Sequence, residues 1–175
     1  MDEINVTLGL KDATFDPDRG LALNGQSVKL RGFCDHDNFG GVGSAVPDRV
    51  NLFRAQASRA VGGNGRRTSH NPPDPAMLHI YDRLGVVVVD ENRLFDNNPA
   101  YVANMGAMVK RDRNHASVVI WSFCNEAGCE GSHEQGCRLA PIGLDAPMPE
   151  MRAPRSSSPL HASKRASRAA TLPRA

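Results

Sequence analysis

The feature that most constrains the fold is an apolar run, residues 118–123, followed closely by the polar pair Asn125-Glu126. The run is short and rich in β-branched and aromatic residues, which is typical of a buried strand. α/β barrels place their catalytic side chains at the carboxyl ends of parallel strands. The run therefore predicts a buried strand of an α/β fold that carries an amide and a carboxylate at its tip.

Three earlier segments repeat this pattern of a short strand followed by polar residues. The predicted strands cover residues 28–33, 64–68 and 86–89, and polar clusters lie near positions 35, 67 and 90. Residues 86–89 are four consecutive valines, which is typical of a strand covered on both faces of a parallel sheet.

Segments with helical spacing of apolar residues separate these strands. We expect helices that begin at Pro47-Asp48 and end before Gly62, that begin near Pro75 and end at Gly85, and that run from about Pro99 to Arg113. Strands that alternate with helices form βαβ units around a parallel sheet. Four such units predict an α/β fold, a partial TIM (β/α)8 barrel.

The two ends of the chain differ from this middle part. Residues 7–10 and 21–28 predict short antiparallel strands with a turn at Asn24-Gly25. We interpret residues 1–27 as a remnant of a β-sandwich domain and the lead-in to the barrel. Residues 28–137 are interpreted as the first half of the barrel.

Residues 138–175 have a composition unlike that of a folded domain. They carry seven basic and two acidic residues, which leaves a net charge of −3 on residues 1–137, and Ala, Arg, Pro and Ser fill 25 of the 38 positions. Such a segment cannot bury enough apolar surface to offset its ordering entropy. We predict a disordered basic tail; an out-of-frame or intron-derived end of the gene would give the same composition.

Four motifs in the predicted barrel, in matching order and spacing, make the chain resemble glycoside hydrolase family 2, and its β-galactosidase branch in particular. They are residues 31–37, 67–73, 88–92 and 111–115, the last running into 121–126. The resemblance implies a glycosidase of carbohydrate metabolism that hydrolyses O-glycosyl bonds of terminal β-linked sugars with retention.

The resemblance also implies roles for individual residues. Glu126 aligns with the general acid/base, and Asn125 with the residue that hydrogen-bonds the sugar 2-hydroxyl. The other implied substrate-binding residues are Arg67, which positions the nucleophilic carboxylate, His36 and His70, which line the sugar pocket, and the acidic pair Asp90 and Glu91 beneath the site.

The family's nucleophile is a second glutamate on a later strand, and nothing after Glu126 matches it. Retaining glycosidases need two carboxyl groups about 5–5.5 Å apart. We therefore predict that the 175-residue chain is inactive alone. A non-catalytic carbohydrate-binding or interaction remnant is the alternative, and a second alternative is nucleic-acid binding through the basic tail.

We predict no metal and no cofactor. Cys124, Cys129, His133 and Cys137 offer zinc-binding atoms, but their spacing departs from the short knuckles of zinc sites. The expected partner is a β-glycoside, without nucleic acid or membrane, because no run approaches the roughly 18 apolar residues of a membrane span. The acidic N-terminus lacks a signal pattern and the cysteines are few, which favours a cytoplasmic location.

Overall fold

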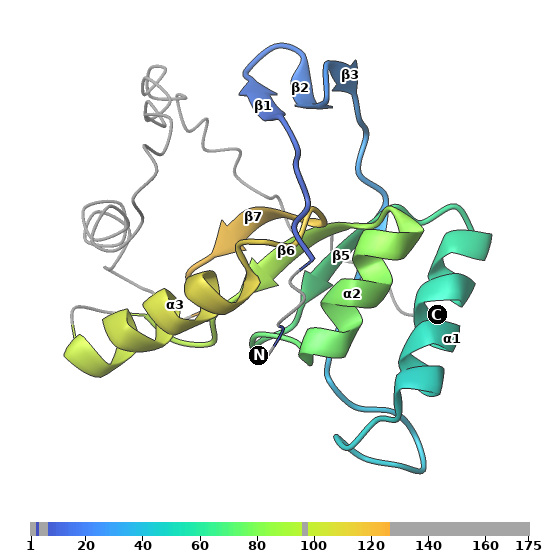
Figure 1. Ribbon diagram of the computed structural model, residues 1–175, viewed down its shortest axis with the longest axis vertical. Coiled ribbons are helices and arrows are strands. Elements are labelled where there is room, and N and C mark those ends of the chain that lie inside the picture. The colour runs from blue at the N-terminus through green and yellow to red at the C-terminus, as the bar shows by residue number, and fades with distance from the viewer. Residues whose placement is uncertain (1–2, 4–6, 96–97, 127–175) are drawn as a thin grey trace, which may run out of the picture.

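The computed structural model of the protein describes residue 3, residues 7–95 and residues 98–126. Four parallel strands form one sheet in the order β4-β5-β6-β7, and three helices connect them along the chain (Figure 1). The elements of this part are β4 (Gly32–Asp35), α1 (Asp48–Ala60), β5 (Gly65–Thr68), α2 (Pro75–Leu84), β6 (Val87–Glu91), α3 (Pro99–Asp112) and β7 (Val118–Ser122). The predicted alternation of strands and helices is confirmed.

Local signals explain where the helices begin and end. The Asp74 side chain accepts a hydrogen bond from the Ala76 N–H at the start of α2, and the Asn98 side chain does the same for Ala100 in α3. Each cap is followed by proline at the first helical position, where the missing N–H costs nothing. Gly85 ends α2 in the left-handed region with φ of 64°, a conformation that favours glycine.

Two clusters of buried side chains hold the helices to the sheet. Leu78 and Tyr81 of α2 pack with Val88 of β6 and Val118 of β7 in the first cluster. The second joins Phe95 to the apolar side of α3, with Met105, Met108 and Val109. Trp121 packs against both clusters, so β7 contacts both.

The first predicted barrel strand lies later in the sequence than expected. The prediction was residues 28–33, whereas β4 covers Gly32–Asp35. The Asn64 side chain explains the difference, because it accepts a hydrogen bond from the Arg31 N–H at 2.7 Å and donates one to the Lys29 carbonyl at 3.0 Å. These backbone groups of Lys29 and Arg31 therefore bond to a side chain instead of to a neighbouring strand.

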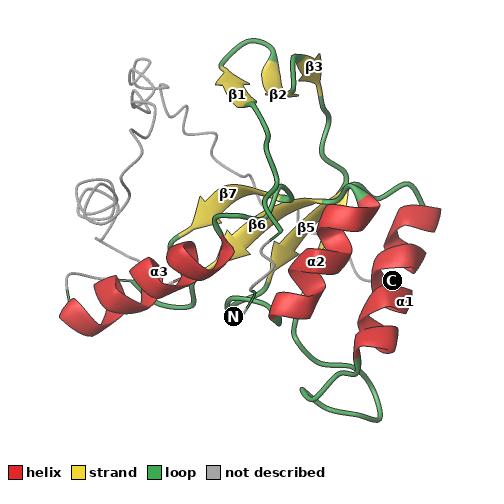
Figure 2. Ribbon diagram, viewed as in Figure 1, coloured by secondary structure: helices red, strands yellow, loops and turns green. Residues whose placement is uncertain are grey.

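The N-terminal segment forms a small antiparallel sheet of its own, apart from the parallel strands (Figure 2). Its strands are β1 (Ala13–Asp16), β2 (Gly20–Leu23) and β3 (Gln26–Ser27). The predicted turn at Asn24-Gly25 is confirmed, with φ of 50° and 78°. Such positive values suit a tight hairpin turn.

The predicted strand at residues 7–10 is wrong. This segment contacts the connection between α3 and β7 instead, where the Gly9 N–H donates to the Asn114 carbonyl at 2.9 Å. Gly9 lies so close to Ala116 that an added Cβ would meet its backbone. The derivation of residues 1–27 from a β-sandwich stays a prediction, and the tail at 138–175 lies outside the described residues. None of the described helices has the length and apolar character needed to cross a membrane.

Candidate active site

Parallel pairing places the carboxyl ends of β5, β6 and β7 at one edge of the sheet. Five side chains from these strand ends and the loops after them join in a hydrogen-bonded group. We call this group the Arg67 cluster, and its members are Arg67, His70, Glu91, Ser122 and Asn125.

Glu91 lies at the centre of the Arg67 cluster and is completely buried. Arg67 donates to it twice, from Nε at 2.6 Å and from Nη2 at 2.9 Å. Ser122 Oγ donates at 2.8 Å, and His70 Nδ1 lies at 2.8 Å. A carboxylate accepts about four hydrogen bonds on its two oxygens, so Glu91 has its acceptor sites filled. It is suited to hold its neighbours in place rather than to transfer a proton.

The contacts of His70 decide its tautomer. Nδ1 lies 2.8 Å from a Glu91 oxygen and 3.4 Å from Arg67 Nη2. The Glu91 contact is the shorter of the two, and because a carboxylate only accepts, it favours the tautomer with the proton on Nδ1. The Nε2 atom of the neutral ring is then an acceptor. The exposed His36 ring lies edge-on to His70, with centroids 5.0 Å apart.

Asn125 is oriented by the same arginine. Arg67 Nη2 donates to Asn125 Oδ1 at 2.7 Å, which fixes the amide so that its NH₂ group points away from Arg67 as a donor. Glu126, the next residue, is exposed and has φ of 53°. A left-handed conformation at a non-glycine residue is uncommon and clusters at functional sites.

Asp90 does not join the hydrogen bonds of the Arg67 cluster, and its place with Glu91 beneath the site stays a prediction. Successive residues of a strand point to opposite faces, so the pair is separated. Asp90 is completely buried, and its polar neighbours are the Thr68 hydroxyl and the Asp112 carboxyl group of α3. Burial raises the pKa of Asp90 to about 8, and the neighbouring Asp112 in α3 acts in the same direction. Asp112 itself accepts two hydrogen bonds from Arg111, at 2.6 and 2.7 Å.

A hollow of about 560 Å³ lies beside His36, and it was not predicted. Its lining includes Asp37 and Asn71, whose amide donates to the Asp37 carboxylate at 3.0 Å. Burial raises the pKa of Asp37, against the opposing effect of the Asn71 hydrogen bond. Both residues belong to motifs that follow β4 and β5, and this position was the signal that could have identified them.

Sequence reasoning also missed the supporting residues of the cluster. Ser122 donates to Glu91, and Thr68 Oγ1 accepts from the Glu91 N–H at 2.9 Å. Strand periodicity alone could not identify them, because their partners lie on neighbouring strands. Of the four residues considered for zinc, Cys129, His133 and Cys137 lie outside the described residues.

Comparison with known proteins decides the family. The family model described as "Glycosyl hydrolases family 2, TIM barrel domain" matches residues 17–98 and 95–141, which is well over half of the chain. This chain belongs to glycosyl hydrolase family 2. The predicted family is thus confirmed, and the four parallel strands with their three connecting helices fit part of a TIM barrel domain.

Individual relatives support the same family assignment. It is 35% identical to "Beta-galactosidase BoGH2A" of Bacteroides ovatus over 72% of its own length and 16% of that protein. It is 32% identical to a "Putative beta-glucuronidase" of Formosa agariphila, over 82% of the chain and 15% of that protein. A solved β-glycosidase from Bacteroides vulgatus superposes with a TM-score of 0.66 at 35% identity, over 75% of the chain and 20% of that structure. The chain thus spans about one sixth of the length of these curated relatives.

Proposed function

We propose that this family 2 chain supplies part of the catalytic barrel of a retaining glycosidase. The glycosidase would hydrolyse O-glycosyl bonds of terminal β-linked sugars, with β-galactosides as the first candidates. The observation that carries the proposal is the 2.7 Å hydrogen bond from Arg67 to Asn125. It joins Arg67 of β5 to the residue immediately before Glu126, at the edge where barrel enzymes perform chemistry.

Asn125 is suited to bind a sugar hydroxyl. Its amide oxygen is occupied by Arg67, so its NH₂ group is left to donate to a hydroxyl oxygen. We assign it to the 2-hydroxyl, where hydrogen bonds strengthen in the transition state of glycoside hydrolysis. The His70 Nε2 acceptor and the exposed His36 ring would line the same sugar pocket.

Glu126 is proposed as the general acid/base. It would protonate the leaving glycosidic oxygen and, after the sugar is transferred to the nucleophile, remove a proton from the attacking water. Its exposure leaves it accessible to a substrate. Arg67 and Glu91 are positioning residues in this scheme, because they hold Asn125 and His70 without needing to touch the reacting atoms.

The described residues offer no evident nucleophile. Glu91 has its acceptor sites filled by Arg67, His70 and Ser122, and Asp90 points to the other face of β6. We therefore propose that the 175-residue chain alone has no turnover. Without turnover, the alternative function of the chain is sugar binding without catalysis.

The test compares hydrolysis of 4-nitrophenyl β-galactoside and β-glucuronide by the 175-residue chain and by the native gene product, whose intact mass is measured first. We expect no turnover by the short chain. In a native product that contains a second carboxylate, Glu126→Gln should reduce kcat by about 10²–10⁴-fold. The reduction in kcat should be smaller for a dinitrophenyl glycoside, because its leaving group needs no protonation.

Three outcomes would contradict parts of the proposal. Turnover by the short chain that disappears in Glu126→Gln would show that the chain is active alone. Full activity of Glu126→Gln in the native product would remove its role as acid/base. A native product that binds a β-galactoside, detected by ligand NMR, but turns over neither substrate would favour the carbohydrate-binding alternative.

A further inference from the structure

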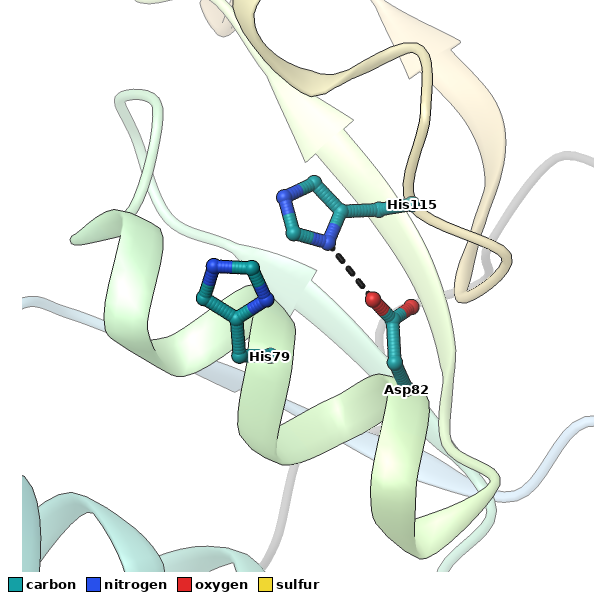
Figure 3. Close-up of side chains that lie close together, drawn as sticks. All are labelled: His79, Asp82 and His115. Atoms are coloured by element: carbon teal, nitrogen blue, oxygen red, sulfur yellow. Dashed lines mark hydrogen bonds and ion pairs between the residues drawn. The ribbon is translucent and has the colours of Figure 1, made fainter. Parts of the chain in front are cut away.

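A second group of polar side chains lies at the opposite end of the sheet from the Arg67 cluster. His79 and Asp82 are three residues apart on α2, and His115 precedes β7. Figure 3 shows the three side chains pointing toward one another from these two segments. The proposed glycosidase mechanism uses none of them.

The geometry of this group is compact. One potential ligand atom from each residue lies within 4.8 Å of the other two. His115 Nδ1 and Asp82 Oδ2 are 2.6 Å apart, and the rings of His79 and His115 have centroids 4.8 Å apart. The His115 and Asp82 side chains are mostly buried, with 11% and 19% exposed, whereas His79 is exposed.

The Asp82 carboxylate is held in an orientation that suits a bound cation. The Ser117 N–H donates to Asp82 Oδ1 at 2.8 Å, which leaves Oδ2 facing His115. Burial alone would raise the pKa of Asp82, but hydrogen bonds from Ser117 and His115 outweigh it and keep the pKa below its ordinary value.

We propose that His79, Asp82 and His115 bind one divalent transition-metal ion, with Zn²⁺ as the reference ion. Two imidazole nitrogens and one carboxylate oxygen form a donor set that zinc accepts, and a water molecule completes a tetrahedron. Zinc would replace the proton between His115 and Asp82, which is released to solvent. This site does not depend on the glycosidase function.

The movement needed to close the site is small. Tetrahedral zinc with bonds of about 2.0–2.1 Å places its ligand atoms about 3.3 Å apart. The His115–Asp82 distance must open slightly from 2.6 Å. The exposed His79 side chain must also approach the other two ligands. The ion would then link α2 to the connection before β7.

Lys11 is a cation that lies close to the proposed site. Its Nζ donates to the His115 carbonyl at 3.0 Å. Burial lowers the pKa of Lys11, and the charge of Asp82 acts in the opposite direction. Lys11 thus neutralises part of the carboxylate charge in the metal-free protein, and its removal should strengthen metal binding.

The test is calorimetric titration of the reduced chain with ZnCl₂, with cobalt(II) absorbance as a second probe. We expect one saturable site without a thiolate-to-cobalt charge-transfer band, which separates it from the cysteine-rich segment that begins at Cys124. His79→Ala and Asp82→Asn should weaken affinity by about tenfold or more, and Lys11→Met should increase it. The control is Arg31→Ala, an exposed change outside this group.

His79→Ala is the decisive variant because this exposed residue can be removed without unfolding the chain. Zinc should also raise the Tm of the wild type, since it binds only the folded state, and the rise should disappear in His79→Ala. Zinc binding that His79→Ala leaves unchanged, thiolate absorbance with cobalt as the only signal, or no binding at all would each overturn the proposal.

Discussion

Glu91 shows how a single buried charge can organise a site. A fully buried carboxylate is tolerated only when charged or polar partners satisfy it, and here four contacts from Arg67, His70 and Ser122 do so. The same contacts orient Arg67 toward Asn125 and determine the tautomer of His70. The chemistry proposed for Glu126 therefore depends on a residue that performs none of it.

Glu91→Gln should be strongly destabilising. The new amide group would face the donors of Arg67 and leave a partly buried guanidinium without its counter-charge. Removal of one partner of a buried ion pair costs about 3–5 kcal/mol. Urea unfolding followed by fluorescence of Trp121 measures the change, with the exposed Asp18→Asn as control. A loss below about 1 kcal/mol, similar to that of the control, would contradict the central role of Glu91.

Asp90 should make the folded state less stable as the pH rises. Its pKa is raised from 3.8 to about 8 by burial and by Asp112, so the unfolded chain releases this proton at lower pH than the folded chain does. The contribution of neutral Asp90 to stability is thus complete below about pH 4 and is lost progressively up to about pH 8.

The comparison that isolates this effect is Asp90→Asn, because asparagine imitates the protonated carboxyl group. The free energy of unfolding of the wild type should fall relative to the variant between pH 5 and pH 8. Each unit of pH contributes at most about 1.4 kcal/mol. Denaturant unfolding of both proteins at several pH values provides the measurement. A difference that is constant or increases with pH would contradict the raised pKa.

At the scale of elements, two glycines in neighbouring helices should respond oppositely to alanine. Gly85 ends α2 with φ of 64°, and Gly106 lies inside α3 without a positive φ; an added Cβ meets no atom within 4 Å at either position. The two alanine substitutions therefore gain no new contacts, and their effects on stability differ only through the backbone conformation at each position.

Gly85→Ala should destabilise the protein by about 1–2 kcal/mol, the cost of a left-handed conformation at a residue with a Cβ. Gly106→Ala should stabilise it by about 0.5–1 kcal/mol, because glycine is a poor residue inside a helix. Thermal unfolding of the two variants provides the measurement. Changes of the same sign would mean that the end of α2 is not set by its left-handed cap.

At the scale of the whole molecule, the prediction concerns residues 138–175, which lie outside the described part of the chain. Their composition predicts no contribution to the folded core. A chain that ends at residue 137 should keep the Tm of the full chain within about 1 °C, since no burial is lost. Calorimetry measures the Tm of both chains.

The same truncation tests the nucleic-acid alternative. A basic segment that contacts phosphates gives binding that weakens steeply with salt. Fluorescence anisotropy with a labelled DNA duplex should detect no difference between the two chains at physiological salt. Salt-sensitive binding that disappears on truncation would favour the alternative, and a clear fall in Tm would show that the tail is part of the fold.

The sequence predicted those elements whose local signals, such as apolar runs and helix caps, match the burial found in the structure. Val88 and Val118 lie in strands recognised from apolar runs, and Pro75 and Pro99 begin helices recognised from their spacing and caps. The first barrel strand was placed too early, because the Asn64 side chain hydrogen-bonds to the backbone of Arg31 and Lys29, which lie 33 and 35 positions away. No local pattern carries that information.

The sequence by itself determined the βα alternation, the turn at Asn24-Gly25 and the identity of the residues that reach the carboxyl edge of the sheet, because these follow from side-chain periodicity and backbone preference. Only the tertiary structure decided what those residues do to one another. It separated Asp90 from Glu91, oriented Asn125 through Arg67 and brought His79 to His115. The physical reason is that hydrogen bonds and charges depend on distances between strands and helices, and the packing of the core sets those distances.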